Sequence, residues 1–278
     1  MQSTSLTRQA KIEHILNRMN RVIDKATKSV TNCFVHGKYT IKSMEKEITV
    51  PISDEVFING FIDRLDELKE DGKNSIRVID YKTGASEFNI KDIYNGVDMQ
   101  MVIYALAAKL KCEEEEQIPY TVTGMYYTKL RGELKRELSE VDKLKKLDGV
   151  TFENNDNFDD GKVLFDMDNE TKNGISTVLP IKFNQNGSLD KKSTEKVRTQ
   201  YEGEKLMEFV RDKILEFDDN IRNKGDIRIM PYEKACDYCN YSNICQISDC
   251  INQRPQEGKD LKADEIWKEI VAKQEEKE

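Results

Sequence analysis

The amino-acid sequence predicts an α/β domain in which a mixed β-sheet is flanked by helices. Strong strand patterns occur at 56–68, 76–82 and 119–131. An apolar run of eight residues, Met101 to Ala108, lies in a helix predicted at 97–111, whose two ends are polar. The chain has 278 residues, which is enough for one large or two small domains with a real core.

The first predicted element is an amphipathic helix over residues 5–30. Its apolar residues recur at three- and four-residue spacing, and they are Leu6, Ile12, Leu16, Met19, Ile23, Ala26 and Val30. Residues 38–50 alternate loosely, which predicts one or two strands. Between the strong strands 56–68 and 76–82 lies K-E-D-G-K-N-S, and Asp-Gly is a preferred two-residue hairpin turn.

The second half of the chain is less regular. Residues 132–200 are rich in Lys, Asp, Asn and Gly, and we expect an insertion with a short helix near 138–147 and a strand near 177–184. A long helix at 193–224 and a final helix at about 262–276 should follow. We therefore expect a main domain over 1–235 and a separate segment over 236–278.

The charge balance limits the classes of function. Lys and Arg number 44 and Asp and Glu 52, so the net charge is −8. This balance argues weakly against a protein that simply coats nucleic acid, but an enzyme could still hold nucleic acid through metal ions and a local basic groove. No apolar run is long enough to span a bilayer, and the start of the chain carries no apolar signal region. We expect a cytoplasmic protein without a membrane partner.

The hairpin 56–82 contains the most informative side chains. If Asp71 and Gly72 form a two-residue turn, Asp63 lies directly opposite Asp80, and Lys82 shares the strand face of Asp80. Two like charges placed opposite each other destabilise a sheet, and a divalent cation is the simplest compensation. A nearby lysine can orient a water or stabilise negative charge. The alternative is an exposed charged hairpin, since a turn one residue longer would move Asp63 to the other face.

Three motifs add weight to the metal hypothesis. G-F-I-D-R-L-D, D-Y-K-T-G and Q-M-V-I-Y resemble motifs of the PD-(D/E)XK nuclease superfamily, in its RecB-like branch. The resemblance implies a restriction-endonuclease-like fold in which Asp63 and Asp80 bind Mg²⁺ (or Mn²⁺), with the main-chain carbonyl of Tyr81 completing the metal shell. Lys82 would support the attacking water.

Further residues enter through the same resemblance. Gln100 and Tyr104 match the family motif Q-x-x-x-Y, and the resemblance implies that they point toward the site and the DNA backbone. Their spacing of four residues indicates only that both lie on the same face of a helix, and an ordinary helix surface is the alternative. In many relatives an upstream Glu also serves the metal. Glu45 and Glu47 both precede the hairpin, and we prefer Glu47.

The remaining predictions for this region concern supporting and DNA-binding residues. Arg64 and Asp66, within G-x-x-D-R-x-D, are interpreted as supporting or DNA-facing side chains. Phosphate contacts could come from a local basic group, for which a solvated surface is the alternative; its members are Lys129, Arg131, Lys135 and Arg136.

A cysteine cluster lies near the end of the chain. Two residues separate Cys236 from Cys239, five separate Cys239 from Cys245, and Cys250 follows after four more. Thiolates at such spacing suit zinc or an iron–sulfur cluster, and free thiols are the alternative. Spacing does not choose between the metals and leaves the fourth ligand open.

The cysteine pattern resembles the C-terminal iron–sulfur motif of the AddB subunits of AddAB helicase–nucleases, and the similarity covers nearly the whole chain. It is also carried by G-V-D-M-Q-M-V-I-Y-A-L, G-M-Y-Y, G-D-I-R-I-M-P and E-I-W-K-E-I. The resemblance implies that Cys236, Cys239 and Cys245 hold a cluster of the 4Fe-4S type. In that family the fourth ligand lies far upstream; Cys33 and Cys250 are the candidates here.

The chain also departs from the family pattern. The family's nuclease domain begins earlier, with a metal-associated His and the first cluster cysteine, and we expect this chain to start after both. His14 and His36 do not stand in that context and are not assigned as ligands. The phosphate-loop pattern G-x-x-x-x-G-K-[ST] is absent, so no ATPase activity is expected.

The resemblance implies a Mg²⁺-dependent DNA exonuclease that processes double-strand breaks for recombinational repair. Its substrates would be single- or double-stranded DNA ends, and its partner an AddA-like helicase subunit. Two alternatives stay open: a catalytically silent DNA-binding or scaffolding fragment, and a free-standing iron–sulfur nuclease of the CRISPR-adaptation type.

Overall fold

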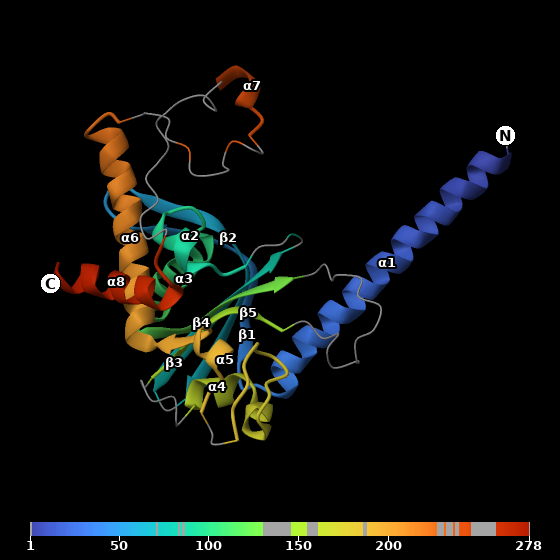
Figure 1. Ribbon diagram of the computed structural model, residues 1–278, viewed down its shortest axis with the longest axis horizontal. Helices are drawn as coiled ribbons and strands as arrows, with labels where there is room; N and C mark the ends of the chain where they lie inside the picture. The colour runs from blue at the N-terminus through green and yellow to red at the C-terminus, as the bar shows by residue number, and fades with distance from the viewer. Residues whose placement is uncertain are drawn as a thin grey trace.

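The structure is a computed structural model, shown in Figure 1. It describes residues 2–70, 72–82, 84, 87–129, 146–154, 161–185, 188–226, 231, 236, 239–245 and 260–277. The helices in these ranges are α1 (Gln2–Val35), α2 (Ile90–Tyr94), α3 (Gln100–Glu116), α4 (Lys162–Met167), a short 3-10 helix (Asn169–Asn173), α5 (Lys191–Thr194), α6 (Gln200–Arg222), α7 (Ser242–Cys245) and α8 (Ala263–Glu275).

The described residues form one six-stranded sheet with the order β1-β2-β3-β4-β5-β6. Its strands are β1 (Thr40–Pro51), β2 (Phe57–Glu70), β3 (Lys73–Lys82), β4 (Tyr120–Lys129), β5 (Asp148–Glu153) and β6 (Val197–Thr199). The pairs β3–β4 and β5–β6 are parallel, and the other pairs are antiparallel. This arrangement confirms the predicted mixed sheet with flanking helices.

The register of the β2–β3 hairpin is also confirmed. The ladder runs from Glu70 opposite Lys73 to Arg64 opposite Ile79, as the two-residue turn requires. Gly72 has φ of +76°, a left-handed conformation that suits glycine in a tight hairpin turn. Asp71 lies outside the described residues.

Apolar cores cover both faces of the sheet. On one face α3, which connects β3 to the parallel β4, packs together with α6 and α8; Val102, Leu206 and Ile266 are fully buried there. On the other face the end of α1, α4, residues 178–183 and Leu189 enclose a second core. Strands β3 and β4 are therefore held in place by packing on both faces of the sheet.

An ion network lies within the second face. Asp66 accepts two hydrogen bonds from Arg64, at 2.7 and 2.6 Å, and one from Arg77 at 2.9 Å. The Arg64 guanidinium also lies 4.6 Å from the centre of the Phe34 ring. Arg64 is only 1% exposed, so it cannot reach a DNA phosphate. Of the two roles predicted for Arg64, supporting or DNA-facing, its burial favours the supporting one.

Several elements differ from the sequence predictions. β5 and β6 lie inside the range predicted as an insertion, yet both belong to the main sheet. The helix predicted near 138–147 lies mostly outside the described residues, and 177–184 forms isolated bridges in place of a strand. The helix predicted from 193 starts at Gln200, because β6 comes first and Thr199 caps the helix. The division into domains at 235 stays a prediction.

The first helix is present, but most of the apolar residues predicted for its buried face are exposed. It extends away from the sheet (Figure 1), and half or more of each apolar side chain along it is exposed at Ile12, Ile15, Leu16, Met19 and Ile23. None of the helices among the described residues combines the length and apolar character needed to cross a membrane.

Candidate active site

The candidate site lies where the β2–β3 hairpin opens. The ladder ends at Arg64 and Ile79, and the earlier part of β2 pairs with β1. Asp63 and Asp80 are the next residues on the two strands. The backbone N–H of Tyr81 donates a hydrogen bond of 2.7 Å to Asp63 Oδ2. The Asp63 carboxylate therefore takes the place of the next ladder bond and is held between the strands.

Asp80 and Lys82 form the second part of the site. Asp80 is 4% exposed, and its Oδ2 lies 2.9 Å from the Lys82 ammonium nitrogen. Burial raises the pKa of Asp80; Lys82 opposes this rise, whereas the charges of Asp63 and Asp98 add to it. The three carboxylates Asp63, Asp80 and Asp98 thus lie in a region with a single ammonium group, that of Lys82. The excess of negative charge favours the binding of a cation there.

Lys82 is held by residues from two other elements. Its ammonium donates a hydrogen bond of 2.8 Å to Gln100 Oε1, and Gln100 Nε2 donates one of 2.9 Å to the Tyr104 hydroxyl. The ammonium also lies 5.3 Å from the centre of the Tyr127 ring. Since Gln100 is the first residue of α3, the start of this helix sets the position of the lysine. The structure brings the predicted Gln100 and Tyr104 to Lys82.

Tyr104 in turn lies against Gly60 of β2. A Cβ atom added at Gly60 would come within 3.3 Å of the Tyr104 ring. The glycine that opens G-F-I-D-R-L-D therefore gives room to the tyrosine of Q-x-x-x-Y. Two motifs that are far apart in the sequence are packed together here.

Two neighbours of the site were not predicted. Tyr127 pairs with Asp80 across the parallel β3–β4 ladder, and Asp98 precedes α3 by two residues. Burial raises the pKa of Tyr127, and the charges of Asp98 and Asp80 raise it further. Asp98 stands within a quoted motif, but only the fold shows that its charge reaches Asp80.

The two further metal contacts stay predictions. Tyr81 uses its N–H to bind Asp63, and its carbonyl is the group predicted to face a metal. Glu47 is exposed and lies opposite Phe61, whereas Glu45 falls between the pairs Met44–Arg64 and Lys46–Ile62, across from Asp63. Among the described residues, no three His, Cys, Asp or Glu side chains are grouped closely enough to hold a metal ion. Two carboxylates do suit Mg²⁺, which usually keeps several of its waters.

The predicted phosphate-binding group is only partly described. Lys129 pairs with Lys82 in the β3–β4 register, and its ammonium forms ion pairs with Glu87 at 2.6 Å and Asp148 at 3.4 Å. Its contact with DNA stays a prediction. Arg131, Lys135 and Arg136 lie outside the described residues.

The three cysteines predicted as cluster ligands lie in and before α7. Cys236 is half-buried, and Cys239 and Cys245 are exposed. The N–H of Cys239 donates to the Cys236 carbonyl at 3.2 Å, and the N–H of Tyr241 donates to Cys239 Sγ at 3.4 Å. A backbone hydrogen bond therefore joins the first two cysteines, and a backbone N–H donates to the sulfur of the second.

The two candidates for a fourth cluster ligand differ in what the structure says of them. Cys33 is buried in the second core, where its thiol donates to the Ser29 carbonyl at 3.3 Å. Burial raises the pKa of this thiol, which disfavours the thiolate that a metal needs. Cys250 lies outside the described residues.

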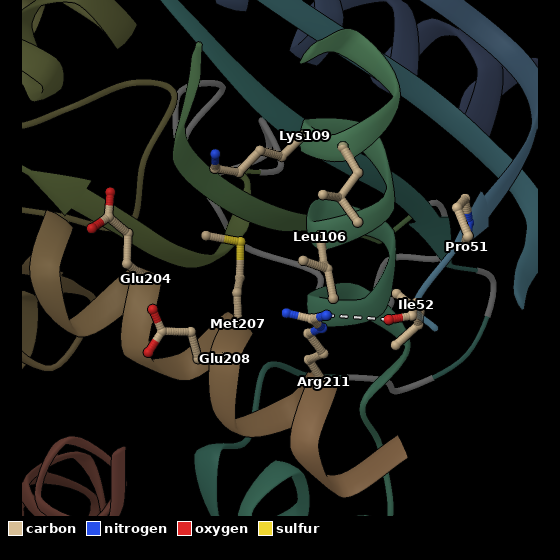
Figure 2. A pocket seen from close by; sticks show the side chains of 9 residues that line it. Pro51, Ile52, Leu106, Lys109, Glu204, Met207, Glu208 and Arg211 are labelled. Atoms are coloured by element: carbon tan, nitrogen blue, oxygen red, sulfur yellow. Dashed lines mark hydrogen bonds between the residues drawn. The ribbon is translucent and has the colours of Figure 1, made fainter. Parts of the chain in front are cut away.

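A separate cleft of about 450 Å³ lies between α3 and α6 (Figure 2). Ile52, Leu106 and Met207 line it, and Arg211 on α6 donates a hydrogen bond of 3.2 Å to the Ile52 carbonyl. None of the carboxylate-site residues lines this cleft. The carboxylate site, at the opening of the β2–β3 hairpin, is therefore separate from this cleft.

Comparison with known proteins agrees with the motifs. Three relatives are each named as a subunit of an ATP-dependent helicase/deoxyribonuclease. The relative from Clostridium perfringens is 30% identical over 298 aligned positions, which cover 98% of this chain and 25% of the relative. The relative from Clostridium acetobutylicum is 30% identical over 294 positions, which cover 95% of this chain and 24% of the relative. The relative from Thermoanaerobacter pseudethanolicus is 27% identical over 280 positions, which cover 92% of this chain and 23% of the relative. The chain spans about a quarter of the length of these relatives.

The family model of the PD-(D/E)XK nuclease superfamily matches residues 2–246. This range includes the carboxylate hairpin, α3 and the first three clustered cysteines. The mixed sheet and the matched range lead to one conclusion: the chain belongs to the PD-(D/E)XK nuclease superfamily.

Proposed function

We propose that the chain is a Mg²⁺-dependent deoxyribonuclease domain that degrades DNA strands from their ends. The observation that carries the proposal is the arrangement of Asp63, Asp80 and Lys82 at the opening of the β2–β3 hairpin. The words deoxyribonuclease and helicase in the names of the relatives supply the substrate class and the context. We place the activity in a helicase–nuclease complex that processes double-strand DNA breaks for recombinational repair, in the cytoplasm, with an AddA-like helicase subunit as partner.

The chain's own residues have distinct tasks in this proposal. Asp63 and Asp80 would hold Mg²⁺ (or Mn²⁺), with the Tyr81 carbonyl and Glu47 as further ligands. When held there, Mg²⁺ would supply Lewis-acid chemistry, namely a coordinated water of lowered pKa and charge neutralisation at the scissile phosphate. Lys82, 2.9 Å from Asp80 and 2.8 Å from Gln100, is placed to orient the attacking water or to stabilise developing negative charge. We expect products with a 5′-phosphate and a 3′-hydroxyl.

End-dependent cleavage is the test of this function. Purified chain is incubated with Mg²⁺ and end-labelled linear DNA, single- and double-stranded, beside a covalently closed circle of the same sequence. We expect the linear strands to shorten from their ends, the circle to persist, and EDTA to stop the reaction. Equal cleavage of circle and linear DNA would contradict an exonuclease. A folded chain that degrades neither would favour the scaffolding alternative.

We also propose that Cys236, Cys239 and Cys245 hold an iron–sulfur cluster, with 4Fe-4S the expected type. The backbone hydrogen bond between Cys239 and Cys236 and the N–H donor on Cys239 Sγ support it, because hydrogen bonds to the sulfurs are among the features that tune such clusters. Protein purified without oxygen should show the broad visible absorbance of such a cluster. Cys239→Ser should lose this absorbance, whereas Cys112→Ser, at a buried thiol of the main core, should keep it. Equal absorbance in both variants would contradict the assignment.

A further inference from the structure

A stripe of basic side chains runs along α1. Its positions follow alternating three- and four-residue steps, so they share one helix face, and each of these side chains is exposed. The basic stripe comprises Lys11, His14, Arg18, Arg21, Lys25 and Lys28. At 1.5 Å per residue it is about 26 Å long.

The charge of α1 is opposite to that of the whole chain. The helix carries six Lys or Arg side chains and two acidic ones, Glu13 and Asp24, which gives a net charge of +4, whereas the chain carries −8. Within the described residues, Lys28 is the one member of the basic stripe in an ion pair, with Asp24 at 3.1 Å. The Lys and Arg side chains at positions 11, 18, 21 and 25 face solvent without a carboxylate partner there, so their charge is open to an external anion.

The basic stripe starts close to the strands of the carboxylate site. The last turn of α1 packs on the back of these strands, where the Phe34 ring lies 4.6 Å from the guanidinium of Arg64. Arg64 is the neighbour of Asp63 in β2, and its Nη1 lies 3.5 Å from the Tyr81 hydroxyl. From this anchor α1 runs outward on the side toward which the arrowheads of β3 and β4 point (Figure 1). The stripe therefore leads away from the site.

We propose that the basic stripe of α1 binds the phosphate backbone of the DNA strand that enters or leaves the Asp63–Asp80 site. The inference rests on the proposed function, which supplies a polyanion as substrate. A stripe of about 26 Å faces roughly eight phosphates of one strand of B-form DNA. Bound in this way, DNA would be held through charge alone, with no selection of bases.

A lipid surface is the competing occupant. Helices that lie on anionic membranes carry basic side chains on their polar face, and the basic stripe of α1 lies on the side of the helix opposite Ile12, Met19 and Ile23. We favour DNA because the proposed function supplies a linear polyanion at the strands on which α1 is anchored, and binding to lipid is an outcome of the test.

DNA binding by full chains tests the inference without any need for cleavage. The parent carries Asp80→Asn to prevent degradation, and the stripe variant adds Arg18→Gln, Arg21→Gln and Lys25→Gln. The matched control adds Lys73→Gln, Lys191→Gln and Lys192→Gln, which change the net charge equally at exposed sites elsewhere. A labelled single strand of about 30 nucleotides is titrated at several salt concentrations.

The stripe variant should bind the strand at least tenfold more weakly near 0.1 M salt, and its plot of log affinity against log salt should be shallower by about 2, for three lost contacts at ~0.7 each. The charge control should match the parent. Arg18→Lys with Arg21→Lys should keep the parent slope, and circular dichroism should show the same helix content throughout.

Three results would overturn the inference: a stripe variant that binds like the parent, a charge control that loses as much affinity as the stripe variant, or a parent that does not bind DNA. Unchanged DNA affinity together with lost binding to vesicles of anionic lipid would assign the stripe to a membrane instead. Failure of the proposed function is seen separately, because cleavage is measured with the chain that keeps Asp80, whereas DNA binding is measured with the Asp80→Asn parent.

Discussion

Lys82→Met is expected to slow Mg²⁺-dependent DNA cleavage by about 10²- to 10³-fold, which is the usual cost of removing one preorganised charge from a reacting centre. The methionine keeps the length of the side chain but cannot bind Asp80 or Gln100. Since Asp80 then loses its cationic neighbour, the affinity for Mn²⁺ should stay the same or rise. The rate should therefore fall while the affinity for Mn²⁺ does not, as initial rates and Mn²⁺ titration can show.

Lys109→Met is the matched control for this prediction. Lys109 is 26% exposed, similar to the 22% of Lys82, and it also forms an ion pair, with Glu113 on the same helix. It lines the separate cleft and not the carboxylate site. Its replacement should leave the cleavage rate within about twofold, since it only breaks a surface pair. A Lys82→Met variant as active as this control would remove the lysine from the mechanism.

Asp66→Asn should lower the free energy of unfolding by about 3–5 kcal/mol, the typical cost of removing one partner from a buried ion pair. Asp66 is the shared counter-charge of two buried guanidinium groups, Arg64 and Arg77. Both Nη atoms of Arg77 already lack a hydrogen-bond partner within the described residues. Without the carboxylate two positive charges would remain buried side by side. Urea unfolding followed by circular dichroism measures the loss.

The control is Asp218→Asn, which breaks an Asp–Arg pair on the surface of α6. Arg222 Nε lies 2.6 Å from Asp218 Oδ1, with the arginine side chain 44% exposed. The cost there should be below about 1 kcal/mol. If Asp66→Asn cost no more than Asp218→Asn, the buried network would have no special role in holding β2 and β3 behind the site.

The hairpin could be predicted from local rules. Asp71 and Gly72 define a two-residue turn, and the period of the strands then sets Asp63 opposite Asp80. The contact of Lys82 with Gln100 could not be derived this way, because it depends on how α3 crosses the sheet. Only the family motif indicated it. Tyr127 was missed because the parallel pairing of β3 with β4 joins residues 47 positions apart in sequence, as in Asp80 and Tyr127.

Burial of charge and exposure of apolar residues explain the other differences. The motif left Arg64 open as a supporting or a DNA-facing residue, and only the fold shows that Asp66 and Phe34 enclose it. The reverse holds for α1, whose period predicted the helix but not that Ile12 and Met19 would be exposed. Periodicity identifies an apolar face; it does not identify what covers that face.

The most direct test of the central claim is Mg²⁺-dependent cleavage of end-labelled linear DNA by the chain, beside Asp63→Asn and Asp80→Asn. Asp92→Asn, at a half-buried carboxylate of α2 that binds Asn89, is the control. We predict that the unaltered chain and Asp92→Asn cleave DNA only when Mg²⁺ is present, and that both other variants lose cleavage while remaining folded. Cleavage at the unaltered rate by Asp63→Asn and Asp80→Asn, or no cleavage by the folded, unaltered chain, would contradict a nuclease site at these two carboxylates.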